Sequence, residues 1–219
     1  MFLQKRSLPI FLLTFLVMLL SGCQTTYYNA MEKIGYEKRD LLLGQISDAR
    51  KAQEKAKEQF ADALEQFISV TNFDGGELEA QYRKLKGEYE DSESRANDVR
   101  DEIKDVERVA RDLFKEWEKE LDQYSTPDLR RSSEQQLQTT RTRYSQLIKS
   151  MKQAEQKIDP VLEAFQDRVL FLKHNLNAQA IASLRSNRAD IESDISTLIA
   201  EMNKSIAEAD KFIASMETK

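Results

Sequence analysis

Residues 78–117 read LEAQYRKLKGEYEDSESRANDVRDEIKDVERVARDLFKEW, and this stretch decides the fold. Its core positions recur at alternating steps of four and three residues, without a slip, for more than five heptads. Only one of these positions, Ser92, is polar. Such a seam predicts one long helix that packs against other helices as a coiled coil. The seam consists of Leu78, Tyr82, Leu85, Tyr89, Ser92, Ala96, Val99, Ile103, Val106, Ala110, Leu113 and Trp117.

A similar seam lies upstream, separated from the first by a predicted turn. The turn contains Gly75 and Gly76, and glycine allows the positive φ values that a chain reversal needs. We therefore expect an antiparallel hairpin of two helices, at about 29–72 and 77–124. The upstream seam is rich in alanine and consists of Ile46, Ala49, Gln53, Ala56, Phe60, Ala63, Phe67 and Val70.

The remaining chain also has helical periodicity. Thr126 suits an N-cap and Pro127 the first position of a third helix. The third seam shifts its phase at Asp159-Pro160, which predicts a kink or a new helix start. A last helix follows a break at either Asn175–Asn177 or Ser186-Asn187, and both alternatives stay open. The third seam runs Leu137, Thr140, Tyr144, Leu147, Met151, Ala154, Ile158, Leu162, Phe165, Val169, Leu172, Leu176, and the last Leu184, Ile191, Ile195, Leu198, Met202, Ala209, Phe212, Met216.

The predicted fold class is all-α, with long antiparallel helical hairpins forming a three- or four-helix coiled-coil bundle. Residues 31–219 form one domain in this interpretation. A compact four-helix bundle and a spectrin-like three-helix stack with a doubled-back tail both satisfy the pattern. The composition agrees, because 32% of residues are charged and the chain has only 3 prolines and 6 glycines.

The N-terminal segment has the features of a bacterial lipoprotein signal. Lys5 and Arg6 precede an apolar run from Ile10 to Leu20, and Leu20-Ser21-Gly22-Cys23 matches a lipoprotein cleavage box. We predict that residues 1–22 are a signal peptide cleaved between Gly22 and Cys23. Cys23 would then carry the lipid, palmitate among its acyl chains, and residues 23–30 would form a tether. The alternative is an ordinary signal peptide, or an N-terminal anchor, with a coincidental cysteine.

Two further features concern the membrane. Gln24 follows the cysteine where an aspartate commonly retains lipoproteins in the inner membrane, so we predict the outer membrane, facing the periplasm. Tyr27, Tyr28 and Tyr36 follow the anchor, and tyrosine rings favour membrane–water interfaces. The alternative is that these tyrosines pack on the base of the bundle.

Composition and motifs argue against catalysis and against several classes of ligand. The formal net charge is −5, and a nucleic-acid or anionic-lipid surface would generally need excess Lys and Arg. A single cysteine allows no internal disulfide and no thiolate metal site. His174 is the only histidine, and Phe171 stands where a Glu-x-x-His metal pair would need its glutamate. We therefore predict no enzyme, no metal and no cofactor. His174, Asn175 and Asn177 are the candidate polar functional residues.

Two stretches resemble a known family. They are YYNAMEKIGYEKRD at 27–40 and FLKHNLNAQAIASL at 171–184. Together with the helical body between them, they resemble a family of uncharacterised proteobacterial proteins defined by a domain of unknown function. The resemblance covers nearly all of the chain after residue 22. It implies an all-helical, coiled-coil lipoprotein and brings no activity, cofactor or catalytic residue. Both stretches also suit structural roles, the second as a helix joint.

The leading functional hypothesis is a non-enzymatic, lipid-anchored envelope protein whose coiled-coil surface binds a protein partner of unknown identity. An alternative is a periplasmic binding module for a small apolar ligand or lipid, with Met151, Met202 and Met216 lining an adaptable cavity. An envelope hydrolase, or its activator, is the least favoured. Homo-oligomerisation is also compatible, because an unsatisfied seam can be buried in a second copy.

Overall fold

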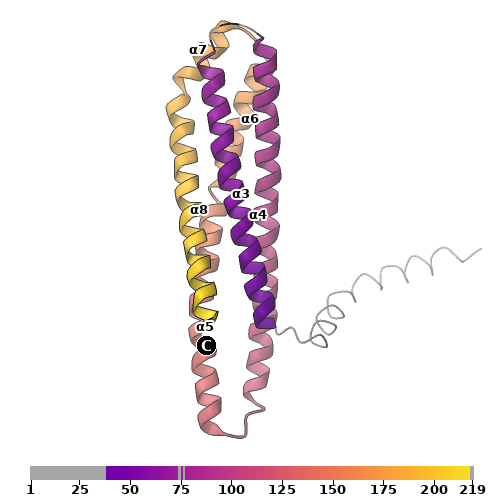
Figure 1. The fold of residues 1–219 in the computed structure, drawn as a ribbon, viewed down its shortest axis with the longest axis vertical. Helices are drawn as coiled ribbons and strands as arrows, with labels where there is room; N and C mark the ends of the chain where they lie inside the picture. Colours follow the sequence, from indigo (N-terminus) through magenta and orange to yellow (C-terminus); the bar gives the residue numbers. More distant parts are fainter. Residues whose placement is uncertain (1–37, 74, 76, 218–219) are drawn as a thin grey trace, which may run out of the picture. The chain divides into compact units, whose positions relative to one another are not determined.

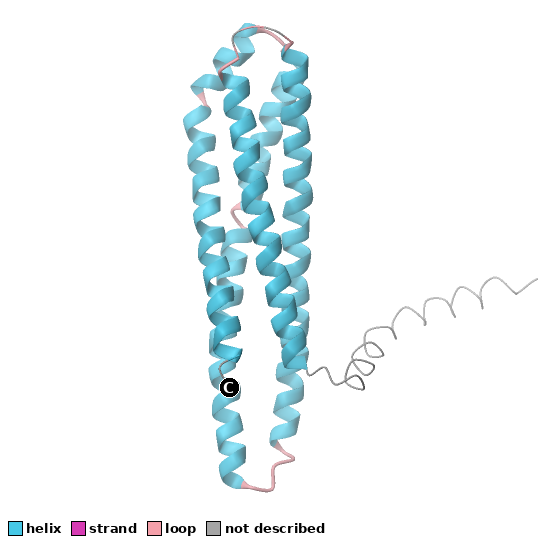
Figure 2. Cartoon of the chain, viewed as in Figure 1, coloured by secondary structure: helices cyan, strands magenta, loops and turns pink. Residues whose placement is uncertain are grey.

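The computed structural model describes residues 38–73, 75 and 77–217, which form helices and short connections without a strand (Figure 2). The predictions for Gly22, Cys23, Tyr27, Tyr28 and Tyr36 concern residues outside this range. The chain divides into two compact units, residues 1–41 and 42–219, and the description below concerns the second. The helices are α3 (Lys38–Thr71), α4 (Leu78–Leu121), α5 (Pro127–Glu155), α6 (Ile158–His174), α7 (Ala178–Ser186) and α8 (Arg188–Glu217).

The long helices of the second unit form a bundle of four columns, namely α3, α4, α5 with α6, and α8. Figure 1 shows their arrangement. Successive columns run antiparallel: α3, then α4, then α5 and α6 end to end, and finally α8. The α5–α6 column packs against both α4 and α8. This arrangement decides between the two architectures left open by the sequence, because the chain forms a four-helix bundle rather than a three-helix stack.

Contacts between α3 and the other columns close the bundle. Gln66 Nε2 donates to Gln81 Oε1 of α4 at 3.0 Å, and Arg50 Nε contacts Asp210 Oδ1 of α8 at 2.6 Å. Across the bundle, the ring of Phe67 meets that of Phe165 of α6 edge-on, with centroids 6.2 Å apart. Helix α3 therefore touches each of the other three columns.

The heptad seams form the core. Every predicted position of the α3 seam, from Ile46 to Val70, is buried, and so is every position of the last seam. In α4 the seam is buried from Leu85 to Leu113 except at Tyr89. The polar Ser92 is accommodated because its Oγ donates to Glu88 O of the preceding turn at 2.7 Å. The periodicity therefore predicted the interior nearly residue by residue.

Some predictions need correction. Leu176 was assigned to the core, but its side chain is 42% exposed because α6 ends at His174, two residues earlier. The seam positions that are half-buried rather than buried are Leu78, Tyr82, Tyr89, Trp117 and Tyr144. Helix α4 ends at Leu121, three residues before the predicted end. The reversal between α3 and α4 is present, but Gly75 adopts no positive φ there.

The breaks in the third column have local causes. Thr126 and Pro127 occupy the predicted N-cap and first helical position of α5. The phase shift predicted at Asp159-Pro160 appears as the interruption between α5 and α6, and Pro160 lies in the first turn of α6, where its missing N–H costs least. Both candidate breaks before the last helix are real, and the short α7 lies between them.

Helices α4 and α5 continue together beyond the end of α8, at the lower end of Figure 1. We call residues 115–136 the hairpin tip. Ser133 is the only buried residue in it, and its Oγ accepts a hydrogen bond from Trp117 Nε1 at 2.8 Å. Tyr124 and Leu129 are 42% and 59% exposed. The hairpin tip is thus a two-helix extension of a four-helix body.

Candidate functional site

All three residues that the sequence singled out for a polar function lie at the joint between α6 and α7. Asn175 Nδ2 donates to Phe171 O at 3.0 Å, and the backbone N–H of Asn175 donates to Leu172 O at 3.1 Å. These bonds satisfy carbonyl groups that the end of α6 would otherwise leave without a partner. The side chain of Asn175 therefore has a structural role at the end of the helix.

Asn177 performs the corresponding role at the start of α7. Its backbone is extended, and its Oδ1 accepts a hydrogen bond from the N–H of Ala180 at 3.0 Å. An asparagine N-cap of this kind contributes about 1 kcal/mol to helix stability. The structure thus shows the helix joint that the sequence offered as the structural interpretation of this stretch.

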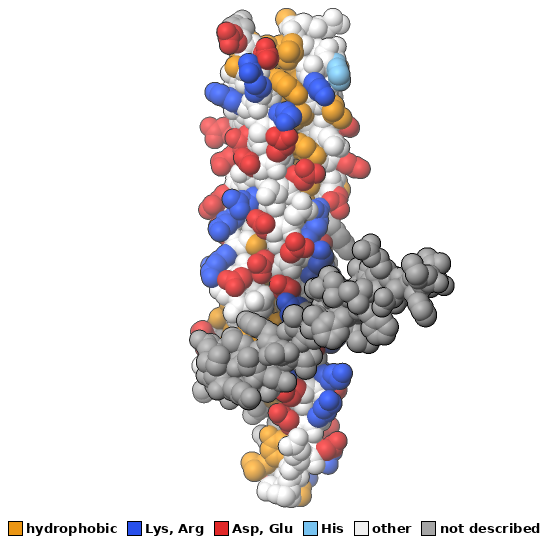
Figure 3. Space-filling view, turned by 90° about the vertical axis from the view of Figure 1, so that its right-hand side faces the viewer, with side chains coloured by type: hydrophobic (Ala, Val, Ile, Leu, Met, Phe, Trp, Pro, Cys, Tyr) orange, Lys and Arg blue, Asp and Glu red, His pale blue; other side chains and the backbone are white. Residues whose placement is uncertain are grey.

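His174 is the last residue of α6 and is exposed. Its neighbours Leu170, Phe171 and Leu176 are 46%, 39% and 42% exposed. Figure 3 shows the histidine near hydrophobic side chains at the upper end of the bundle. We call Leu170, Phe171, Lys173, His174 and Leu176 the α6 end patch.

Sequence reasoning missed the apolar part of this patch. Leu170 and Phe171 lie between the seam positions Val169 and Leu172, so they belong to the outward side of the helix. Large apolar residues off the seam were a signal that could have identified them. Among the described residues, the other exposed large hydrophobic side chains are Tyr124 and Leu129 of the hairpin tip.

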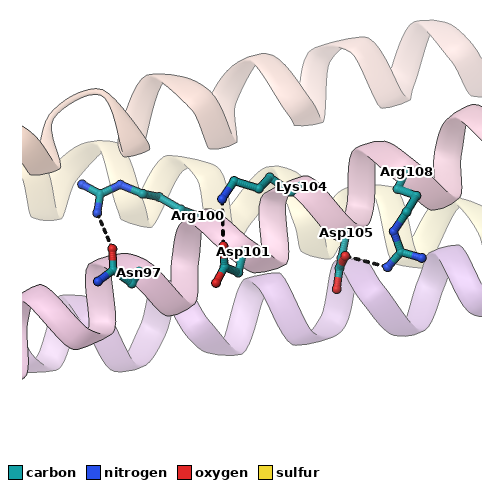
Figure 4. Close-up of polar contacts among 6 residues, drawn as sticks. All are labelled: Asn97, Arg100, Asp101, Lys104, Asp105 and Arg108. Carbon is teal, nitrogen blue, oxygen red and sulfur yellow. Dashed lines mark hydrogen bonds and ion pairs between the residues drawn. The ribbon is translucent and has the colours of Figure 1, made fainter. Parts of the chain in front are cut away.

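The charged faces of the helices are largely internally paired. On α4, Arg100 Nη1 donates to Asn97 Oδ1 at 2.8 Å, and Lys104 Nζ contacts Asp101 Oδ1 at 2.8 Å (Figure 4). Arg108 Nη2 contacts Asp105 Oδ1 at 2.6 Å in the next turn. These partners are three residues apart on one helix, which is the spacing of solvated pairs that stabilise helices by tenths of a kcal/mol. These pairs stabilise α4, and their charged side chains are spread along the helix rather than gathered at one site.

One carboxyl group in this region has a perturbed pKa. Partial burial, reinforced by Asp48 of α3 and by Asp105, Asp98 and Asp101 of α4, raises the pKa of Glu102. Clustered carboxylates are also the ligands that cations such as Ca²⁺ take in proteins. Within the described residues, however, no three His, Cys, Asp or Glu side chains are arranged to hold a metal ion.

An aromatic cluster marks the place where the body meets the hairpin tip. The rings of Phe114 and Tyr144 pack edge-on with centroids 5.4 Å apart, and Arg141 lies 5.2 Å over Phe114. Burial, aided by Glu107, raises the pKa of Tyr144 to about 12. Its phenol therefore stays protonated at neutral pH, and the cluster packs the two helices together.

Three of the buried polar side chains in the core have polar atoms without a hydrogen-bond partner among the described residues. Gln53 of α3 is fully buried, and neither its Nε2 nor its Oε1 has a hydrogen-bond partner among the described residues. Ser150 and Ser205 are also buried with unpaired Oγ atoms. Buried polar groups at seam positions reduce stability and can fix the register of a coiled coil. Gln53 is the clearest case, because it interrupts a seam of alanine and phenylalanine.

None of the helices in the described part of the chain has a stretch long and apolar enough to cross a bilayer.

Comparison with known proteins identifies a family without an assigned role. The model of a family described as "Protein of unknown function (DUF2959)" matches residues 27–216. No curated protein and no solved structure matches the chain. The family resemblance expected from the stretches at 27–40 and 171–184 is confirmed.

Proposed function

The chain belongs to the DUF2959 family, whose function is unknown, and from this premise we propose that it is a non-enzymatic lipoprotein of the cell envelope. In this proposal Cys23 carries the lipid, residues 1–22 are removed, and the protein lies at the outer membrane facing the periplasm. The helical bundle presents its surface to a protein partner. The observation that carries the proposal is the box Leu20-Ser21-Gly22-Cys23, which contains the only cysteine of the chain.

A binding role is supported by the contrast between polar side chains that have structural roles and the exposed apolar side chains of the hairpin tip. Two of the three candidate polar residues, Asn175 and Asn177, cap helices, and charged residues of α4 such as Lys104 and Asp101 pair with one another. The hairpin tip, in contrast, exposes Tyr124 and Leu129. Tyrosine is enriched in protein interfaces, so we propose the hairpin tip as the surface that meets the partner.

Cell fractionation tests the anchor. We expect the wild-type protein in the outer-membrane fraction, and Cys23→Ala should abolish acylation and change its fractionation. Gln24→Asp is the matched variant, since it keeps Cys23 and should move the protein to the inner membrane. Recovery of an unacylated, soluble protein, with Cys23→Ala leaving the distribution unchanged, would contradict the proposal.

Site-specific photocrosslinking in cells tests the partner surface. A crosslinker at Tyr124 should capture one defined protein, and the exposed Ser196 of α8 is the control position. Leu129→Ser should remove the adduct from Tyr124 if the two side chains share the interface. Equal capture from Tyr124 and Ser196 would show that the hairpin tip is not selective.

A further inference from the structure

The residues around the α6–α7 joint have a charge composition unlike the rest of the chain. Residues 168–189 read RVLFLKHNLNAQAIASLRSNRA, with four Lys or Arg and no Asp or Glu. This stretch carries +4, so the remaining residues carry −9 to give the total of −5. The acidic average of the chain therefore conceals a basic segment that also contains three of the described exposed large hydrophobic side chains.

The exposed side of α6 brings the two properties together. Successive helical residues are rotated by about 100°, so four side chains follow one another around this side in the order Lys173, Leu170, His174 and Phe171. Val169 and Leu172 point the other way, into the core. The exposed Asp167 lies one turn earlier and limits the patch to the last turns of the helix.

The cations of the segment differ in their availability. Arg188 pairs with Glu192 at 2.5 Å, and Arg168 stacks over Phe67 at 5.8 Å. Among the described residues, neither Lys173 nor His174 has a side-chain hydrogen bond or an ion pair. Arg185 is exposed and donates only its Nε to Thr71 O, at 2.9 Å. Lys173 and Arg185 are thus the cations left for an external anion.

We infer that the α6 end patch binds an anionic phospholipid surface, with Leu170, Phe171 and Leu176 entering the interfacial layer and Lys173 contacting headgroups. Apolar side chains flanked by Lys or Arg are typical of interfacial helices. Each basic residue near an anionic leaflet strengthens binding by about fivefold. A stable protein interface needs about 1,000 Å² or more, whereas this patch is confined to the end of one helix.

The inference goes beyond the proposed anchor and does not depend on it. If Cys23 is acylated, the 14 residues at 24–37 between it and α3 can span at most about 50 Å, and α3, with its 34 residues, is about 50 Å long. The patch can therefore reach the anchoring membrane. A weak contact then becomes intramolecular and is strengthened by effective concentration.

The test uses the protein recovered from membranes and reconstituted into vesicles. His174→Cys carries an environment-sensitive fluorophore between Leu170 and Phe171, and Ser196→Cys on α8 carries the control label. In vesicles of phosphatidylcholine with phosphatidylglycerol, the label at 174 should shift to shorter wavelength and be quenched by nitroxide lipids. The label at 196 should do neither, and vesicles of phosphatidylcholine alone should give a much smaller change at 174.

Two surface variants sharpen the result. Leu170→Ser with Phe171→Ser should abolish the quenching, and Lys173→Gln should weaken the contact equilibrium about fivefold. These side chains are exposed or half-exposed, so the helical circular dichroism should not change. A label at 174 that stays in water with phosphatidylglycerol present would overturn the inference. Protection of position 174 in cells but not in vesicles would overturn it in favour of an acidic protein partner.

Labelling of the wild-type chain distinguishes a failure of the lipid contact at the α6 end patch from a failure of the proposed acylation at Cys23. An acylated Cys23 has no free thiol, so the wild type should take up no label. Labelling of the wild type would count against the proposed lipidation, and the lipid contact at 174 would then be tested in a Cys23→Ala background, where the thiol introduced at 174 is the only one.

Discussion

The four-helix body and the hairpin tip continue the same heptad seam of α4, yet they differ in what surrounds it. In the body, Val99, Ile103 and Val106 are almost completely buried because both α3 and the α5–α6 column pack against α4. In the tip, Trp117 and Leu121 are only half-buried because α5 is the only described neighbour there. Periodicity thus fixes which side of a helix faces a partner, and the number of partners fixes how much stability that side provides.

The largest expected effect concerns Phe67, in the core of the body near the end of α3. Phe67→Ala should lower the free energy of unfolding by about 3–5 kcal/mol, because it removes a fully buried ring and its contact with Phe165. Trp117→Ala in the hairpin tip removes a larger side chain but should cost less, since the indole is half-buried. Urea denaturation of both variants measures the difference. A greater loss for the tip would contradict the division into a stable body and a peripheral tip.

A smaller effect, of opposite sign, is expected for Gln53. Gln53→Leu should raise the free energy of unfolding by about 1–3 kcal/mol, because it removes an amide whose N and O are buried without partners. The same urea experiment measures it, with the exposed Gln138→Leu on α5 as control. If Gln53→Leu destabilises the fold, or changes the oligomeric state, the amide serves to specify the register.

The hydrogen bond between Trp117 and Ser133 provides a test within the tip. Ser133→Ala should cost about 1 kcal/mol or less, since it leaves the half-exposed indole N–H able to bond with water. Hydrogen exchange should speed up in residues 115–136 and stay unchanged in α8. Faster exchange throughout the bundle would show that the tip and the body unfold as one unit.

The smallest expected effect is the pH dependence from Glu102. Burial and neighbouring carboxylates raise its folded pKa, so the folded state favours the protonated form. The stability that it contributes is complete below its unfolded pKa, about 4.3, and is lost as the pH rises through the higher folded pKa. Glu102→Gln should therefore raise the melting temperature at neutral pH and flatten its decline from acid to neutral pH. Glu163→Gln, an exposed carboxylate on α6, is the charge-matched control.

The sequence allowed the body to be predicted because its helices are held by local, periodic information. The seams of α3, α4 and α8 and the interruption near Pro160 all follow from spacing or from proline chemistry. The prediction that Leu176 lies in the core was wrong because the heptad spacing continues in the sequence beyond the residue where the hydrogen-bonded helix ends. Asn175 and Asn177 end one helix and start the next, and that role depends on backbone geometry which residue types alone do not specify.

The exposed ends were harder to predict than the core. Heptad spacing does not state where α8 ends relative to α4 and α5, so the hairpin tip could not be separated from the body. The basic segment at 168–189 was visible in the sequence, but averaging charge over the whole chain concealed it. Local charge, counted along individual helices, identifies such a segment where net charge does not.

The most direct test of the central claim, an envelope lipoprotein anchored at Cys23, is the mass of the N-terminal peptide of the protein recovered from cell membranes. The account predicts a peptide that begins at Cys23, lacks residues 1–22, and carries the added mass of diacylglycerol and an amide-linked acyl chain. A peptide that begins elsewhere, or that contains Cys23 with a free thiol, would contradict it.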